Sequence, residues 1–159
     1  MAAEFARETR TTRTHLERLP EDRLDWRPHA KSYTARDLAS HIVDCVGWAE
    51  RIMIAPAFDF DPSTYHIFRA TSVADLLNAF DTVVDRGARA LADDRNGNLS
   101  EMWSFKVRGR VWFEKTKADV LRDFTLSHLI HHRGQLTVYL RLLDVPVPCS
   151  YGPTADEKG

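Results

Sequence analysis

The chain has 159 residues, of which 43% are hydrophobic and 28% are charged, a composition typical of globular proteins. Its formal net charge is −1, so it lacks the basic excess with which proteins neutralise a nucleic-acid backbone. We find no secretory signal and no apolar run long enough to span a membrane. The two cysteines are too few for a disulfide scaffold. We therefore expect a cytoplasmic protein with one domain over residues 1–159.

Two helices are predicted in the first third of the chain. The first covers Ala2–Leu19, where apolar residues and threonines recur at three- and four-residue steps. A polar linker, Pro20–Ser32, separates it from the second helix. That helix begins near Thr34, where an aspartate three residues later indicates a capping box, and it ends by Pro56. Its apolar stripe includes His41, which a helix of a globular protein turns toward the core.

The rest of the chain contains two more predicted helices and one extended segment. The third helix begins near Ser72 and ends before the polar stretch Asp93–Asn98. Apolar and polar residues alternate over Met102–Phe113 on both sides of Arg108-Gly109, which favours a short hairpin or an extended crossing segment. The last helix covers Thr116–Leu143, again with an aspartate three residues after its first threonine.

Four amphipathic helices of this length bury their apolar stripes against one another, so we predict an all-α four-helix bundle. The connection before the last helix, from about Asp93 to Lys115, is long enough to cross the bundle. A simple up-and-down order of the helices is therefore not required.

Three histidines form a candidate metal site. His128 and His132 are four residues apart in the last helix, which stacks their side chains on one face. His41 lies on the apolar stripe of another helix, where a histidine without a hydrogen-bond partner or a metal is costly. Three imidazoles on two helices would leave coordination positions open for water or substrate, as in catalytic zinc sites.

Other polar residues offer alternatives to this assignment. Cys45 follows His41 by one helical turn and is either a thiolate ligand or a small core residue. Asp44 either reaches the site or lies on a solvated face. His131 is rotated by about 100° from His132, so it is either a flanking residue that orients a ligand or an exposed one.

Several segments of the chain resemble the DinB/YfiT-like family. The run His-Leu-Ile-His-His-Arg-Gly-Gln at 128–135 is similar to the signature of that family. Leu24–Pro28 and Leu38–Ile42 resemble its first half, and Val145–Pro148 and Tyr151–Glu157 resemble its ending. The resemblance therefore covers nearly the whole chain.

The resemblance implies a four-helix bundle of DinB/YfiT type with a long crossover before the last helix. It also implies one divalent ion, usually nickel or zinc, held by His41, His128 and His132, and it implies frequent homodimers. The balanced charge argues against nucleic acid as a partner, and the lack of a long apolar run argues against a membrane. We expect a small-molecule substrate instead.

The resemblance also suggests activities. Relatives include enzymes that use low-molecular-weight thiols, and a metal in an open site lowers the pKa of a bound thiol. We therefore expect a metal-dependent thiol S-transferase that acts on small electrophiles, with Arg133 binding a substrate carboxylate or pairing with another helix. Gln135 is expected to support the site or the packing by hydrogen bonding. The alternatives are a metal-dependent hydrolase and a non-catalytic metal- or ligand-binding stress protein whose site is closed by a fourth ligand.

Overall fold

Four helical runs follow the predicted pattern in a computed structural model that describes residues 1–93 and 98–158. Their bounds are Ala2–Leu16 for α1, Ala35–Ile54 for α2 and Val73–Ala92 for α3, followed by a run of α4 (Lys117–Val120), a π-helix (Leu121–Ser127) and α5 (His128–Leu142). A short 3₁₀-helix, Glu21–Arg23, lies in the first linker. Most of the stretch Asp93–Asn98 that was predicted to end the third helix lies outside the described residues.

Side-chain caps begin three of these helices at the predicted threonine and serine positions. Thr34 accepts a hydrogen bond from the backbone N–H of Asp37 at 3.0 Å, which satisfies one of the free donors of the first turn. Ser72 at the start of α3 and Thr116 at the start of α4 make the equivalent bond. The capping pattern in the sequence therefore predicted these three helix starts.

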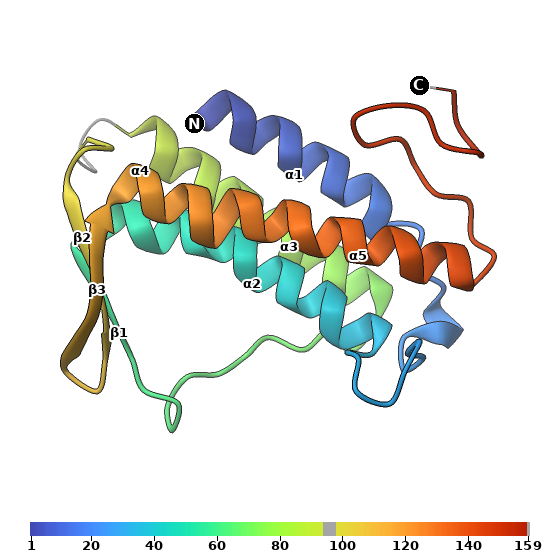
Figure 1. Cartoon of the computed structure of the whole chain (residues 1–159), viewed down its shortest axis with the longest axis horizontal. Helices are drawn as coiled ribbons and strands as arrows, with labels where there is room; N and C mark the ends of the chain where they lie inside the picture. The colour runs from blue at the N-terminus through green and yellow to red at the C-terminus, as the bar shows by residue number, and fades with distance from the viewer. Residues whose placement is uncertain (94–97, 159) are drawn as a thin grey trace.

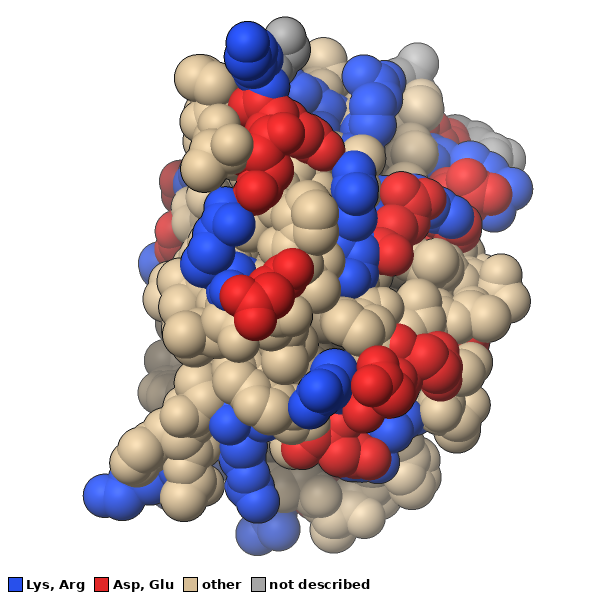
Figure 2. Space-filling model, turned by 90° about the vertical axis from the view of Figure 1, so that its right-hand side faces the viewer, with Lys and Arg blue, Asp and Glu red and all other residues tan. Residues whose placement is uncertain are grey.

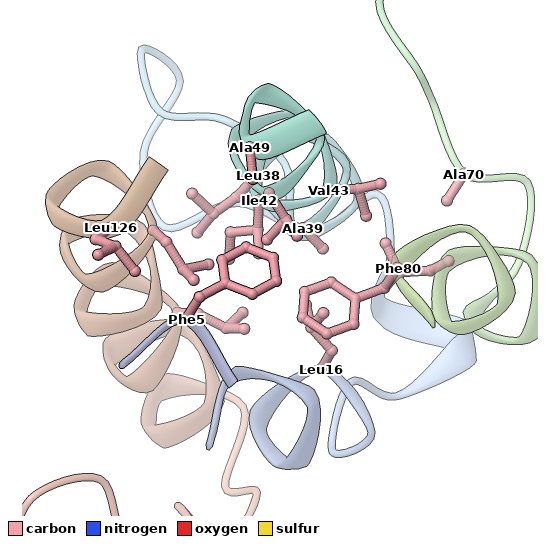
Figure 3. Close-up of a cluster of buried hydrophobic side chains, with 14 of the residues drawn as sticks. Phe5, Leu16, Leu38, Ala39, Ile42, Val43, Ala49, Ala70, Phe80 and Leu126 are labelled. Atoms are coloured by element: carbon pink, nitrogen blue, oxygen red, sulfur yellow. The ribbon is translucent and has the colours of Figure 1, made fainter. Parts of the chain in front are cut away.

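The four helical runs lie alongside one another and enclose the core (Figure 1). In the view along the bundle, side chains from all of them meet at its centre (Figure 3). The buried side chains include Phe5 of α1, Ile42 of α2, Phe80 of α3 and Leu126 of the π-helix, each at most 2% exposed. Burial of such side chains stabilises the fold by roughly 1.5–3 kcal/mol each.

The prediction of an all-α fold is wrong, because three strands form a mixed sheet at one end of the bundle (Figure 1). Strand β1 (Ala57–Phe60) pairs in parallel with β2 (Met102–Val107), and β2 pairs antiparallel with β3 (Arg110–Thr116). The β2–β3 hairpin confirms the predicted extended segment. Strand β1 was missed because four residues are too few to show an alternating pattern, and its partner lies far along the chain.

The hairpin turn and an aromatic cluster join the sheet to the bundle. Arg108 and Gly109 both have positive φ, 48° and 78°, as a two-residue turn between twisted strands requires. The Trp48 ring of α2 contacts Phe58 of β1 and Phe124 of the π-helix, with centroids 5.0 and 5.7 Å apart. The sheet thus packs on the part of α2 that follows His41.

Charges of both signs alternate on the face of the molecule shown in Figure 2, without a large patch of one sign. This distribution agrees with the net charge of −1. Within the part of the chain that the structure describes, no helix is both long enough and apolar enough to cross a membrane.

Candidate metal centre

The three predicted histidines converge between α2 and α5. His41 projects from the second turn of α2, and His128 and His132 project from the beginning of α5. The Nε2 atoms of His41 and His128 are 3.3 Å apart. The three ring centroids form a nearly equilateral triangle with sides of 5.0, 4.6 and 4.7 Å. Helical spacing predicted the His128–His132 pair, the apolar stripe of α2 predicted His41, and the packing of α2 on α5 brings the three together.

Cys45 joins the same group. Its Sγ lies 3.8 Å from Nε2 of His41, one turn earlier in α2, and its side chain is 1% exposed. One donor atom from each of Cys45 and the three histidines lies within 4.8 Å of the others. The group of potential donors found among the described residues does not include Asp44.

These distances fit a single metal ion. Two imidazole nitrogens bound to a tetrahedral zinc-type ion lie about 3.3 Å apart, and a nitrogen and a thiolate sulfur lie about 3.6 Å apart. The observed 3.3 and 3.8 Å are close to these values. Imidazole and thiolate donors favour zinc, nickel, copper or iron over magnesium or calcium, which prefer oxygen.

A hydrogen bond beside the site fixes the orientation of the His132 ring. Nδ1 of His132 lies 2.8 Å from Oε1 of Gln135, which can only accept, so Nδ1 is protonated and Nε2 keeps its lone pair. The backbone carbonyl of Phe124 acts to raise the pKa of His128, and Nε2 of this ring faces Nε2 of His41. A partner such as Gln135 holds a metal-binding histidine in the required tautomer.

The electrostatics keep the imidazoles neutral, as metal binding requires. Burial, together with His132 and His128, lowers the pKa of His41 to about 4. Burial also lowers the pKa of His128 and His132, against the opposing hydrogen bond from His132 to Gln135. Burial raises the pKa of the Cys45 thiol to about 12, so without a metal the thiol stays protonated at neutral pH.

The π-helix directly precedes the two histidines of α5. A π-turn holds more residues than an α-turn, so it changes the direction in which the following side chains point. Phe124 within it faces Trp48 of α2, and His128, one turn later, faces His41. Neither propensity nor apolar periodicity distinguishes a π-turn from an α-turn, so the sequence did not reveal it.

Arg133 points away from the histidines. Its guanidinium lies 2.8 Å from the Glu8 carboxylate of α1, and both side chains are only 2% exposed. Tyr151 of the C-terminal segment donates to the same carboxylate at 2.7 Å. Burial acts to raise the pKa of Glu8, but the hydrogen bonds from Tyr151 and Arg133 lower it below its usual value. Arg133 was predicted either to bind a substrate carboxylate or to pair with another helix, and the structure shows that it pairs with Glu8 of α1.

The remaining histidines and Asp44 lie outside the cluster. His131 is exposed, with its ring 4.9 Å from that of His132, so of its two predicted placements the structure shows the exposed one. Asp44 is partly buried, and burial raises the pKa of its carboxyl to about 6 despite the opposing charge of Arg51. His15 is fully buried on α1.

Two residues of the first linker contact this region and were not predicted. Tyr33 places its ring 6.1 Å from that of His41. Together with Lys31, it lines a cavity that also touches His132 and Gln135. Only the folding of the linker against α5 brings them there, so neither spacing nor composition could have identified them.

A helical bundle with histidines converging between two helices defines the class of fold, and comparison with known proteins identifies the family. Residues 1–158 match the DinB family, and the chain belongs to this family. A Bacillus subtilis (strain 168) relative, described as the uncharacterized protein YrdA, is 27% identical over 157 residues. That match covers 94% of this chain and 85% of YrdA.

Two solved structures have a similar fold. A DinB-like protein from Bacillus cereus ATCC 10987 is 23% identical, with a TM-score of 0.68 over 92% of each chain. The DinB-like protein YjoA from Bacillus subtilis is 18% identical, with a TM-score of 0.69 over 99% of this chain and 98% of its own. The family and the fold that the sequence resembles are thereby confirmed.

Proposed function

We propose that the chain binds one divalent metal ion through His41, His128 and His132 and is a metal-dependent thiol S-transferase for small electrophiles. The observation that carries this proposal is the convergence of three neutral imidazoles, with ring centroids 4.6–5.0 Å apart. Gln135 holds the His132 ring in the tautomer that a metal requires.

The chemistry of such a site is substitution by a thiol. A bound divalent ion lowers the pKa of a thiol so that the reactive thiolate is available near neutral pH. With a chlorinated aromatic electrophile, the sulfur forms a bond to the ring carbon and chloride leaves, while the thiol proton passes to solvent. The protein itself orients the donors through His132 and Gln135 and provides an approach through the cavity that His132 lines.

The position of Cys45 favours a second candidate function. With Sγ 3.8 Å from His41 Nε2, Cys45 is close to the place of a fourth ligand. A tetrahedral ion held by three histidines and one cysteine has no open position, as in structural zinc sites. The protein would then bind a metal without catalysing a reaction.

Metal content tests the ligand assignment. We expect about one ion per chain in protein purified without an affinity tag, and loss of this ion in His132→Ala. A full complement of metal in that variant would contradict the assignment. Cobalt substitution then separates the two candidates, because a thiolate ligand adds a sulfur-to-metal charge-transfer band that disappears in Cys45→Ala. A five- or six-coordinate spectrum without this band supports the open site.

Turnover tests the activity. The metal-loaded protein is incubated with 1-chloro-2,4-dinitrobenzene and with glutathione, coenzyme A, mycothiol or bacillithiol in turn. We expect product formation with at least one thiol, and its loss after chelation. Absence of turnover with all four thiols would reject the transferase, and metal-dependent hydrolysis of ester substrates without a thiol would favour the hydrolase.

Three further expectations stay predictions from the sequence: nickel or zinc as the ion, a homodimer, and a cytoplasmic location.

A further inference from the structure

A cavity of about 390 Å³ opens beside the histidine cluster, between the first linker and α5. Its lining residues are Lys31, Ser32, Tyr33, His132, Gln135, Val138 and Tyr139. His132 belongs both to this lining and to the cluster of potential metal donors. This volume is in the range of small-molecule sites, and a ligand bound in it would contact His132.

Exposed apolar side chains form part of the wall of the cavity. Tyr33 and Val138 are 53% and 55% exposed, although both are large apolar side chains. The Tyr33 ring lies at a tilt of 39° to that of His41. Aromatic side chains that are left open beside polar groups are typical of sites that stack a flat or apolar ligand.

The linker that forms one wall is held in place. The hydroxyl of Tyr139 donates to the backbone carbonyl of Tyr33 at 2.9 Å, and the Trp26 ring packs edge-on against Tyr139. The backbone N–H groups of Lys31 and Ser32 donate to the Nδ1 and the carbonyl of His29. The cavity is therefore formed before any ligand binds, which reduces the entropy lost on binding.

The charge of the lining selects the ligand. Lys31 is its one cationic side chain, and its seven residues include no carboxylate. A second cavity, of about 360 Å³, contains Arg51 but also Asp59 and Asp61, and it touches none of the cluster residues. The cavity beside His132 therefore combines an unbalanced positive charge with contact to one of the candidate metal ligands.

From this geometry we infer that the cavity is the substrate site, and that it takes a small carboxylate whose apolar part stacks on Tyr33 while its charge pairs with Lys31. The inference rests on the proposed function, since the cavity shares His132 with the proposed metal centre. The carboxylate belongs either to the electrophile or to the thiol, because both classes of molecule can carry one. Lys31 and Tyr33 act on binding and specificity, not on the chemical step.

The test measures binding by calorimetry at low salt, with metal-free and with metal-loaded protein. The probes are 4-chlorobenzoate as an acidic electrophile analogue, S-methylglutathione as a thiol analogue, and the neutral 4-chlorobenzamide. We expect Lys31→Gln to weaken binding of at least one carboxylate by about three- to fivefold and to leave the amide unchanged. The affected probe identifies the source of the carboxylate. Tyr33→Ala should weaken the aromatic probes, charged and neutral alike, by about fivefold or more.

The control variant is Lys106→Gln, which removes the same charge from β2, outside the lining of the cavity. Equal affinities for both carboxylates in wild type and Lys31→Gln would overturn the inference, as would an equal loss in Lys106→Gln. If a carboxylate binds through Lys31 but the protein takes up no metal ion when one is supplied, only the proposed metal function fails. If metal binds but neither carboxylate does, only this inference fails.

Discussion

At the scale of single residues, the site depends on side chains that never touch the proposed metal. Gln135 accepts from Nδ1 of His132, and this bond decides which nitrogen of the ring has a free lone pair. Arg133, the neighbour of His132 in sequence, is held on the other face of the helix by Glu8. A buried pair of this kind fixes the rotation of α5 relative to α1, and with it the direction of His132.

The role of Gln135 leads to a quantitative prediction. Gln135→Ala removes the acceptor for Nδ1–H of His132, so the ring is free to rotate and to change tautomer. We expect metal affinity to fall by about ten- to a hundredfold, as measured by competition with a chelating dye. Gln135→Glu keeps an acceptor oxygen at the same distance along the side chain and should recover most of the affinity. Affinity equal to wild type in Gln135→Ala would show that the packing of α5 alone orients the ring.

At the scale of elements, local signals in the sequence predicted the helices and most of the site. Capping residues such as Thr34 mark helix starts through a bond that involves neighbours only, and the four-residue spacing of His128 and His132 is also local. Strand β1 depends on a parallel partner far along the chain, and the contact of Tyr33 with His41 depends on how the linker folds. Such non-local features leave no periodic pattern, so one sequence alone does not reveal them.

Helix packing at a glycine gives a second prediction. A Cβ at Gly87 of α3 would lie 2.7 Å from Cζ of the buried Phe5 and 3.1 Å from Cβ of Ala49. We expect Gly87→Ala to lower the free energy of unfolding by about 1–2 kcal/mol, because overpacking outweighs the gain in helix propensity. Gly134→Ala in α5, where nothing lies within 4 Å, should raise it by about 1 kcal/mol.

Urea unfolding of both variants in the presence of a chelator provides the comparison. Stabilisation by Gly87→Ala would mean that Phe5 can move aside, and that α1 is packed less tightly on α3 than the distances indicate.

At the scale of the whole molecule, the C-terminal segment is attached to α1 through polar contacts with the buried residues Glu8 and His15. Tyr151 reaches Glu8, and the Ser150 hydroxyl lies 3.2 Å from Nε2 of His15. The other ring nitrogen of His15 donates to the Thr11 carbonyl at 2.8 Å, and the side chain is fully buried. The segment after α5 is thus tied to the first helix by groups whose protonation matters for folding.

His15 therefore makes the stability of the whole chain depend on pH. Burial lowers its pKa, and so does the charge of Arg133, against the opposing effects of the Thr11 carbonyl and Glu157. In the unfolded chain a histidine has a pKa of about 6.5. Because the pKa of folded His15 is lower, at and below pH 6.5 His15 binds more protons in the unfolded chain than in the folded one. The stability contributed by neutral His15 is complete above this pH and is lost as the pH falls toward the lower, folded value. Through this one group, the free energy of unfolding cannot change by more than about 1.4 kcal/mol per pH unit.

His15→Asn isolates this contribution, because asparagine can still donate to Thr11 but does not titrate. We expect wild type to be the more stable protein at pH 7.5 and its advantage over the variant to shrink steadily toward pH 5.5. Chemical unfolding of both proteins with a chelator measures that difference, and the acid response of His41, His128 and His132 cancels because both chains carry them. An advantage that stays constant over this range would mean that folded His15 takes up its proton as easily as the unfolded chain. The contact with Ser150 would then adapt to the charged ring, and the segment after α5 would be more loosely tied to α1 than its hydrogen bonds indicate.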